Sequence, residues 1–244
     1  MLKIISWNIC GLPKKINFFH NPNKKINLVV DKLLQLNSDI ICLQEVFDYT
    51  LRKRIIDKLE ENKYNVHFND TGKCKCFMST NGLLTASKYN ITGTDLFNYT
   101  KGSGYDFFIK KGILTVSIYH PILKEIEIHN THMQSDVFPF CSLGKWSRKT
   151  QFNEAIEYMD LSKNSIFLGD LNDDFSSTRL NDFKIKSCMV SNEYRIPTFP
   201  SLNNQFDYIF TNIKNIERKY YEIDVVSELL SDHNIMMIKI DRIS

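Results

Sequence analysis

The sequence predicts a single α/β domain that contains mixed β-sheets. Strand and helix signals interleave along all 244 residues, the middle of the chain is rich in strand signals, and no Pro- or Gly-rich linker divides it. A chain of this length fits one sheet-based domain and buries roughly 75% of the surface of its unfolded form. We therefore expect residues 1–244 to form one domain.

The first part of the chain alternates apolar runs with helical periodicity. Leu2–Ser6 predicts a buried strand that leads into a loop over 8–13. Asn21-Pro22 predicts a helix start, because Asn caps helices and Pro suits their first turn. Asp39–Leu43 predicts the second strand, which ends at Gln44-Glu45. A second helix is predicted by apolar residues at every fourth position: Leu51, Ile55 and Leu59.

The rest of the chain is predicted mainly as strands, with one further helix. The middle strands are Tyr64–Phe68, Gly82–Ser87, Ile113–Tyr119 and Glu125–His129. Helical spacing returns around Phe152 and Met159. The last strands are Ser165–Leu168, Phe206–Phe210 and Ile235–Ile240.

Composition excludes several classes of protein. A hydrophobic content of 43% with 12% aromatic residues is typical of a globular chain, not a disordered one. The net charge of +3 is compatible with an anionic substrate but is too small to indicate a dedicated nucleic-acid binder. No apolar stretch approaches the ~20 residues that cross a bilayer, and no signal-peptide pattern opens the chain. We expect a soluble, cytoplasmic monomer, or one that contacts a membrane peripherally, with reduced cysteines.

Polar residues that suit metal and phosphate chemistry follow six of the short strands or lead-in segments. They are Asn8, Glu45, His132, Asp170, Asn172, Asp207, Asp232 and His233. One polar group after a strand is ordinary. Six such places suggest that strand ends converge on one site for metal-assisted phosphate chemistry.

Each group in this set suits one part of phosphodiester hydrolysis. Mg²⁺ neutralises phosphate charge and is held by one or two carboxylates, so Glu45 suits a ligand, while Asn8 can hold the metal or its water. Taken alone, Glu45 can equally be a carboxylate in the first turn of a helix. Asp170 can take a proton from water while Asn172 positions it, although Gly-Asp-x-Asn is also an ordinary turn.

The histidines suit contacts to the phosphate. A carboxylate beside His233, from Asp207 or Asp232, fixes its tautomer and favours its protonated form. His132 can donate to a non-bridging phosphate oxygen, although a lone histidine at a strand end is more often structural.

Six short motifs resemble, in order and spacing, those of the endonuclease/exonuclease/phosphatase superfamily. They are Ser6-Trp7-Asn8, Leu43–Val46, Asn130-Thr131-His132, Gly169–Asn172, Phe206-Asp207-Tyr208 and Ser231-Asp232-His233. The resemblance implies a four-layer α/β/β/α sandwich, with two packed mixed β-sheets and the site at one edge.

The resemblance also implies roles for the residues. Glu45 and Asn8 lie at Mg²⁺, for which Mn²⁺ is the alternative ion, and His132 contacts the phosphate. Asp170 and Asn172 bind or activate the water, Asp207 orients His233, and Asp232 lies close to the metal or the water. The family supports either Asp170 or His233 as the base: Asp170 suits a nuclease-like path and His233 a sphingomyelinase-like one.

Local features favour the sphingomyelinase-like branch. Asn81–Lys88 and Asn130–Gln134 are similar to stretches of those enzymes, and Asp106 with Lys111-Gly112 resembles their Asp/Lys-Gly switch. Lys111 can pair with Asp106 or approach the phosphate. The alternative is an exposed pair worth at most about 1 kcal/mol.

The substrate remains open at this stage. The apolar segment Val137–Trp146 can dip into a lipid interface or pack inward. The leading hypothesis is a Mg²⁺-dependent phosphodiesterase that acts on a phospholipid. The alternatives are a nuclease acting on DNA or RNA, a phosphatase of small phosphoesters, and an inactive binding module.

Overall fold

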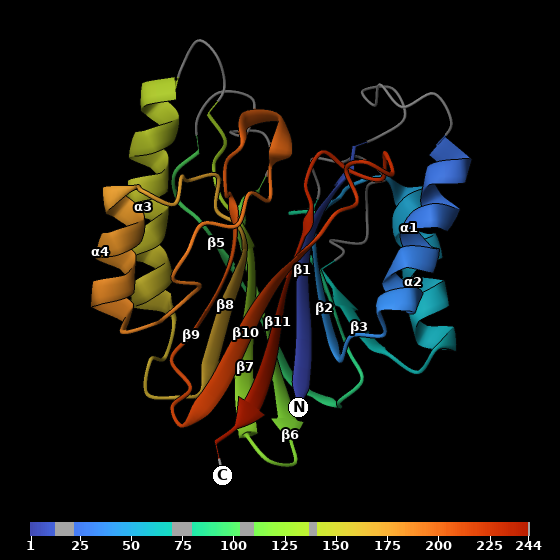
Figure 1. Cartoon of the computed structure of the whole chain (residues 1–244), viewed down its shortest axis with the longest axis horizontal. Helices are drawn as coiled ribbons and strands as arrows, with labels where there is room; N and C mark the ends of the chain where they lie inside the picture. Colours follow the sequence, from blue (N-terminus) through green and yellow to red (C-terminus); the bar gives the residue numbers. More distant parts are fainter. Residues whose placement is uncertain (13–21, 70–79, 103–109, 137–140, 244) are drawn as a thin grey trace.

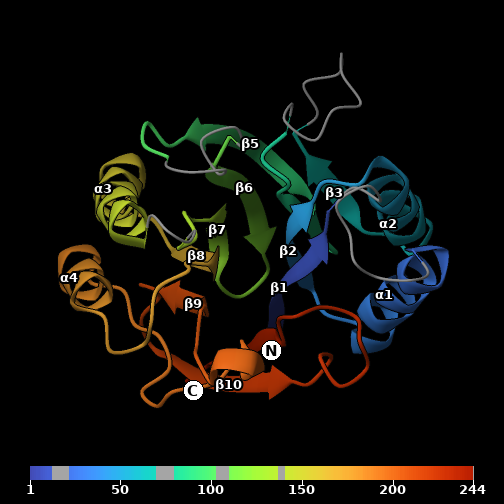
Figure 2. The same cartoon turned by 90° about the horizontal axis from the view of Figure 1, so that it is seen from above.

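Two β-sheets pack face to face in the computed structural model, and two helices cover the outer face of each sheet (Figure 1). The structure describes residues 1–12, 22–69, 80–102, 110–136 and 141–243. Figure 2 shows the four layers from above, with α1 and α2 on one side and α3 and α4 on the other. The predicted α/β/β/α sandwich is therefore confirmed.

The first sheet has six strands in the order β10-β11-β1-β2-β4-β3. Their bounds are β1 Leu2–Gly11, β2 Ile40–Val46, β3 Asn65–Phe68, β4 Leu84–Ser87, β10 Ile216–Ile223 and β11 Ile235–Arg242. Its outer face is covered by α1, Pro22–Leu36, and α2, Tyr49–Glu61. The Asp48 side chain caps α2 by accepting the backbone N–H of Leu51.

The second sheet has five strands in the order β5-β6-β7-β8-β9. Their bounds are β5 Ile91–Asn98, β6 Gly112–His120, β7 Lys124–His132, β8 Ser165–Asp170 and β9 Asp207–Thr211. Its outer face is covered by α3, Cys141–Tyr158, and α4, Thr178–Ser187, and a short 3-10 turn, Pro200–Leu202, precedes β9.

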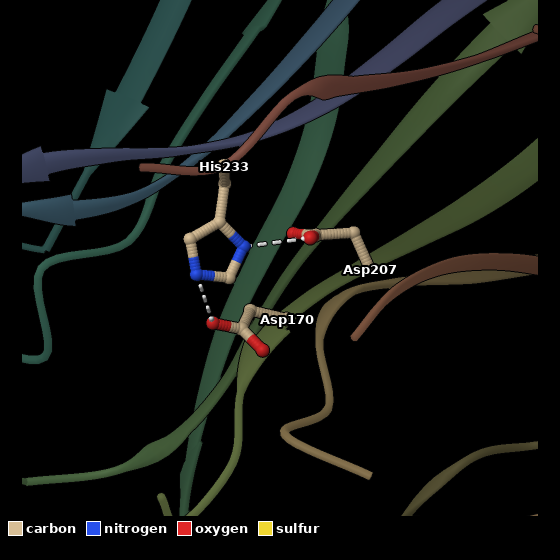
Figure 3. Close-up of side chains that lie close together, drawn as sticks. All are labelled: Asp170, Asp207 and His233. Atoms are coloured by element: carbon tan, nitrogen blue, oxygen red, sulfur yellow. Dashed lines mark hydrogen bonds and ion pairs between the residues drawn. The ribbon is translucent and has the colours of Figure 1, made fainter. Parts of the chain in front are cut away.

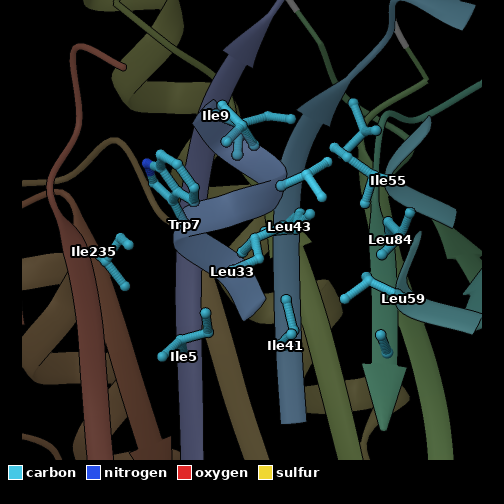
Figure 4. Packing of buried hydrophobic residues seen from close by; sticks show 14 of the residues in the cluster. Ile5, Trp7, Ile9, Leu33, Ile41, Leu43, Ile55, Leu59, Leu84 and Ile235 are labelled. Atoms are coloured by element: carbon cyan, nitrogen blue, oxygen red, sulfur yellow. The ribbon is translucent and has the colours of Figure 1, made fainter. Parts of the chain in front are cut away.

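Three apolar layers hold the sandwich together. Trp7, Leu33 and Leu59 belong to the layer between the first sheet and its helices (Figure 4). Ile4 and Ile128 belong to the layer between the two sheets. A third cluster, around a group of phenylalanine rings, fills the space under α3 and α4. Residues one step apart on a strand enter different layers because successive side chains of a strand point to opposite faces.

Strand register brings the predicted site residues to one edge of the sandwich. β1 runs parallel to β2 and pairs Asn8 with Gln44, and β7 runs parallel to β8 and pairs His132 with Asp170. β9 runs antiparallel to β8 and pairs its first residue, Asp207, with Asp170. The carboxyl ends of four strands therefore meet the start of a fifth.

A buried carboxamide pair ties the two sheets together beneath this edge. Asn130 on β7 donates from Nδ2 to the carbonyls of Leu43, 3.1 Å, and Leu84, 3.0 Å, which both belong to the opposite sheet. Its Oδ1 accepts from Gln44 Nε2 at 2.8 Å. Both side chains are fully buried. These bonds satisfy polar groups that would otherwise destabilise the apolar layer.

Several sequence expectations need correction. β1 continues to Gly11, so residues 8–11 of the predicted loop belong to a strand, and His132 also lies within its strand. The expected loop before the helix around Phe152 is already helical from Cys141. Residues 137–140 and Asn21 lie outside the described residues. The sequence analysis did not predict β5, β10 or α4.

Two further expectations concern the membrane and the cysteines. Among the described residues, none of the helices combines the length and apolarity that crossing a membrane requires. Among the cysteines whose side chains the structure describes, Cys10, Cys42 and Cys188 are free thiols.

Candidate active site

The predicted polar residues that the structure describes do gather at one edge of the sandwich. Their side chains lie at the carboxyl ends of β1, β2, β7 and β8, at the start of β9 and in the segment before β11. Asp106, the predicted partner of Lys111, lies outside the described residues.

Asn8 links the two sheets through two carboxylates. Its Nδ2 donates to Glu45 Oε1 at 3.1 Å and to Asp170 Oδ2 at 3.0 Å. Its Oδ1 accepts the backbone N–H of Cys10 at 3.0 Å. The carboxamide is therefore held at both ends, with its donor group between two acids that come from different sheets.

Glu45 occupies an unusual backbone position for a strand residue. Its φ of 58° lies in the left-handed region, which is sparsely populated by residues other than glycine. Non-glycine residues are retained there where the surrounding structure imposes the conformation, often at functional sites. Burial raises the pKa of Glu45, and the positive charge of Lys111 opposes that rise. A buried carboxylate in this position is stabilised by a neighbouring cation.

Asp170 ends β8 with its two oxygens in different surroundings. Oδ1 accepts the backbone N–H of Asn172 at 2.9 Å, while Oδ2 faces Asn8 and the two histidines. Burial raises the pKa of Asp170 to about 7, the charge of His233 opposes the rise, and Asp207 adds to it. This carboxyl group can therefore exchange a proton near neutral pH.

The glycine before Asp170 is required by strand pairing. Gly169 has a φ of 141°, and a Cβ atom there would lie 1.8 Å from the carbonyl oxygen of Thr131 on β7. Asn172 also adopts a left-handed φ, 50°, and its Nδ2 donates to the Met133 carbonyl at 3.1 Å. In the Gly-Asp-x-Asn motif, the glycine thus allows β7 and β8 to lie close together, and the turn at Asn172 holds Asp170 in place.

His233 lies between two carboxylates (Figure 3). Its Nδ1 is 2.7 Å from Asp207 Oδ2, and its Nε2 is 3.6 Å from Asp170 Oδ2. Burial alone would lower the pKa of His233, but Asp207 and Asp170 outweigh burial and raise it to about 10. The imidazole is therefore protonated at neutral pH in this arrangement. The Phe199 ring packs edge-on to it, with centroids 4.8 Å apart.

His132 has the opposite protonation preference. Burial, and then the charges of Lys111 and His233, lower its pKa well below the usual value. Lys111 Nζ lies 3.0 Å from its Nε2, and an ammonium group can only donate, so Nε2 accepts here and the neutral ring carries its proton on Nδ1. The same Nε2 lies 3.6 Å from Asp170 and 3.9 Å from Glu45. Lys111 thus lies inside the site, next to His132.

Asp232 lies on the solvent side of the site. Its side chain is exposed, and its Oδ1 is 3.3 Å from the hydroxyl of Ser231, which donates to the Asn8 carbonyl at 2.6 Å. Asp232 also interacts with the Cys10 thiol and with Glu45. It therefore faces the Glu45 side of the site.

Two groups of residues have the chemistry to hold a metal ion. Asp170, Asp207 and His233 offer ligand atoms within 4.8 Å of one another. However, the hydrogen bond between Asp207 and the protonated His233 occupies Nδ1 and opposes a cation there. Glu45 and Asp232 offer carboxylate oxygens, which Mg²⁺ prefers. The Asn8 carboxamide faces Glu45 with its Nδ2 while its Oδ1 accepts from Cys10, so Asn8 would hold the ion only after its carboxamide turned. The two carboxylates fit Mg²⁺ on the Glu45 side.

A cavity of about 550 Å³ opens beside His233 and Asn172. Phe199, Leu202 and Phe206 give it an apolar wall. Charged residues of its lining form ion pairs with one another: Arg148 pairs with Asp136, and Arg179 pairs with Asp173. The cavity is large enough to take part of a substrate next to the histidine.

Sequence reasoning missed two kinds of residue here. The sheet-bridging role of Gln44 and Asn130 has no sequence signal beyond two polar residues in apolar strands. Lys25 was not singled out from the sequence, yet it is 7% exposed and its Nζ donates to the Cys10 carbonyl at 3.0 Å beside the site. The sequence did contain one signal for Lys25. A lysine in the first turn of a predicted helix is disfavoured by the helix dipole, so its presence there suggests a specific contact.

The fold and this edge site together define an α/β/β/α sandwich protein with an acid- and histidine-lined site at its strand ends. The model of the endonuclease/exonuclease/phosphatase family matches residues 5–233, and the chain belongs to this family.

The chain is similar to curated relatives over much of its length. Sphingomyelinase C from Leptospira interrogans is 28% identical over 191 residues, a match that covers 70% of this chain and 34% of that protein. The chain spans about a third of the length of three curated relatives that it matches.

Solved structures share the whole fold. Sphingomyelinase C from Streptomyces griseocarneus superposes with a TM-score of 0.77 at 14% identity and covers 97% of this chain and 98% of that one. A Staphylococcus aureus beta toxin mutant with bound magnesium ions gives 0.74 at 19% identity, with coverage of 97% and 98%. At these identities the similarity establishes the fold alone.

Proposed function

We propose that this protein is a Mg²⁺-dependent phosphodiester hydrolase that cleaves a phospholipid of the sphingomyelin type by attack of water on phosphorus. The observation that carries the proposal is the His233 imidazole, held between Asp207 and Asp170, next to the hydrogen-bonded pair of Asn8 and Glu45. This arrangement offers a metal ligand, a proton acceptor and a cationic donor within one small site.

Glu45, Asn8 and Asp232 are the residues that would hold the ion. When bound, Mg²⁺ supplies positive charge that stabilises the phosphoryl oxygens. Neither Mn²⁺ nor Mg²⁺ requires a sulfur or nitrogen ligand, and all three side chains offer oxygen.

Asp170 is the proposed base. Its pKa of about 7 leaves a substantial ionised fraction at neutral pH, whereas His233, with a pKa of about 10, already carries its proton. Asp170 would take the proton from the attacking water, and Asn172 would hold the turn that presents Asp170. The protonated His233 would stabilise charge on the phosphate and donate a proton to it or to the leaving oxygen. Asp207 keeps this imidazole charged and oriented.

Lys111 and His132 form the proposed phosphate-binding pair. In the structure Lys111 donates to His132 Nε2. A phosphate dianion or monoanion is a stronger acceptor than a neutral imidazole, so we expect Lys111 to turn to the substrate. That movement would free Nε2 of His132. The neutral ring, with its single proton moved from Nδ1 to Nε2, would then donate to a non-bridging oxygen.

Two features support a lipid substrate. The relatives carry the name sphingomyelinase. Leu143 and Trp146 lie in the first two turns of α3 with exposed fractions of 49% and 56%, on the same helix as Arg148, which lines the cavity. Exposed apolar side chains beside a site are suited to contact a membrane interface, where Trp is favoured at headgroup level.

Activity on three substrates would test the proposal. Purified protein with Mg²⁺ is incubated with sphingomyelin vesicles, supercoiled DNA and a phosphoinositide. We expect release of the phosphorylated headgroup from sphingomyelin, abolished by EDTA and by Asp170→Ala. Plasmid nicking with inert vesicles would support a nuclease instead. Inertness toward all three would favour a binding module.

A further inference from the structure

Another cavity, of about 710 Å³, lies at the edge of the sandwich opposite the candidate active site. Strand β8 begins at Ser165, next to the lining residue Asn164, and ends at Asp170 in the site, so the length of this strand, roughly 17 Å, separates the two. The turn between β6 and β7 and the C-terminal end of the chain lie at this lower edge (Figure 1). The cavity is therefore a separate place on the molecule.

The lining of this cavity carries positive charge without an acid to balance it. The chain has 31 lysines and arginines against 28 acidic residues, so a mixed lining would be expected. The cavity is instead lined by five cations and no carboxylate: Lys124, Lys163, Lys186, Lys214 and Arg242. Within the described part of the chain, Lys163 is the one of the five that pairs with a carboxylate, that of Glu127 at 2.6 Å. A concave surface with this charge attracts anions.

Two of the other lysines have neutral partners. Lys124 Nζ donates to the hydroxyl of Tyr119 at 3.4 Å. Lys186 Nζ donates to Oδ1 of Asn153 at 3.3 Å. Both are long hydrogen bonds, and a phosphate oxygen is a stronger acceptor than either neutral group. Both ammonium groups can therefore exchange these partners for an anion.

Hydrogen bonds between loops hold the frame that carries the cations. Asn164 Nδ2 donates to the Leu123 carbonyl at 3.1 Å, which joins the segment before β8 to the turn between β6 and β7. Asn212 Nδ2, in the loop after β9, donates to the Lys163 carbonyl at 2.8 Å. These bonds fix the backbone beside Lys124 and at Lys163.

A similar bond joins the last two cations. The backbone N–H of Ile243 donates to the Asn215 carbonyl at 3.1 Å, so the residue after Arg242 is tied to the residue after Lys214. The cations thus project from backbone that is already ordered. A preorganised frame lowers the entropic cost of binding a ligand.

The cavity also has an apolar part. Ile213 and Ile216 line it and are buried in the layer between the two sheets. Its volume falls within the range of cavities that hold small organic ligands, roughly 300–1,000 Å³. A concave site with clustered cations and some apolar surface suits a small molecule better than a flat membrane surface.

We propose that this cavity binds a soluble organic polyphosphate, with its phosphate groups among the five cations and its organic part against the apolar lining. The site is distinct from the one proposed for hydrolysis, so either can exist without the other. The phosphates replace the neutral partners of Lys124 and Lys186 and relieve the repulsion among the lining cations.

Calorimetric titration of the full chain with ATP, in EDTA and low salt, provides the test. We expect saturable binding that is weakened at least about tenfold by the pair Lys214→Gln and Arg242→Gln, because two charges facing the phosphates are lost. The matched control is the pair Lys53→Gln and Arg54→Gln. It removes the same two charges from exposed residues of α2, on the other side of the sandwich, and should change the affinity less than about twofold.

A second pair and a vesicle assay complete the experiment. Lys124→Gln with Lys186→Gln should weaken ATP binding in the same way, and serves if the first pair does not fold. The proteins are also pelleted with vesicles of phosphatidylcholine that contain a phosphoinositide, and the lining variants should pellet like the control.

Three results would overturn the inference. They are the absence of saturable ATP binding to the unmodified protein, equal weakening by the lining and control pairs, and loss of vesicle pelleting by the lining variants without any ATP binding. The last of these would assign the cations to an anionic membrane instead.

Discussion

His233 and Asp207 form a buried hydrogen-bonded pair, with Nδ1 of the imidazole 2.7 Å from Oδ2 of the carboxylate. The pair joins the segment before β11 in one sheet to the first residue of β9 in the other. It helps to keep the imidazole protonated and directs Nε2 toward Asp170. The charge of the histidine therefore depends in part on a contact between the sheets.

Asp207→Asn should lower the activity about a hundredfold or more, because the imidazole loses the charge that keeps it protonated and oriented. In the metal-free protein the pKa of His233 should fall from about 10 toward the ordinary histidine value. Histidine NMR titration measures that fall, and Asp57→Asn, which alters only an exposed pair with Lys53, is the control. Unchanged activity together with an unchanged histidine titration would contradict the assigned role.

Gly169→Ala should cost at least about 3 kcal/mol in the free energy of unfolding. The added Cβ would meet the Thr131 carbonyl at 1.8 Å, and strands β7 and β8 would have to separate at the site. Denaturant unfolding measures the loss. Gly93→Ala is the matched control, because a Cβ there meets Ser117 at an ordinary 3.6 Å. Equal stability of the two variants would show that β7 and β8 do not pair this closely.

His129 should make the protein less stable as the pH falls from 7 to 4. Burial lowers its pKa to about 4, from 6.5, while Thr115 bonds its Nδ1. As the pH drops, this histidine takes up a proton in the unfolded chain before it does so in the folded protein. The free energy of unfolding therefore falls as the pH drops below the unfolded pKa of 6.5, and the fall is complete below the folded pKa of about 4. The full loss from this group is about 3 kcal/mol. His129→Gln cannot protonate and should show a flatter decline in urea unfolding between pH 7 and 4; an identical slope would assign the loss to other groups.

Trp146→Ser and Leu143→Ser should each reduce hydrolysis of vesicle sphingomyelin about fivefold, because each removes apolar surface that enters the interface. Hydrolysis of a water-soluble phosphodiester should not change. Ile185→Ser on α4, with an exposed fraction of 75%, removes a comparable exposed apolar side chain from a different helix and is the control. Equal losses on soluble and vesicle substrates would instead place Trp146 and Leu143 in the support of the site.

The central strands of each sheet were predicted from the sequence better than the edge strands. A central strand such as Ile40–Val46 is almost entirely buried and therefore has a long apolar run. β5 and β10 are edge strands with mostly exposed or half-buried residues, and β10 carries Glu217, Arg218 and Lys219 in succession. Their apolar signal is weak because one face and one edge meet solvent. α4 buries only three of its ten residues and was missed for the same reason.

The site was predictable as a set of residues but not as a geometry. The order of the motifs predicted that Asn8, Glu45 and Asp170 belong to one site. Each of these residues follows or ends a strand, and strand ends meet at one edge of a sheet sandwich. No sequence pattern shows that Lys111 donates to His132, since the contact depends on the packing of β6 against β7. The prediction that residues 1–244 form a single domain, and the predicted monomeric state, stay predictions.

The position of oxygen incorporation tests the central claim most directly. Sphingomyelin vesicles are hydrolysed in H₂¹⁸O with Mg²⁺, and both products are analysed by mass spectrometry. Attack of water on phosphorus predicts ¹⁸O in the phosphorylated headgroup and none in the lipid alcohol, with no products when EDTA is present. Appearance of ¹⁸O in the alcohol, or equal hydrolysis without the metal, would contradict the account.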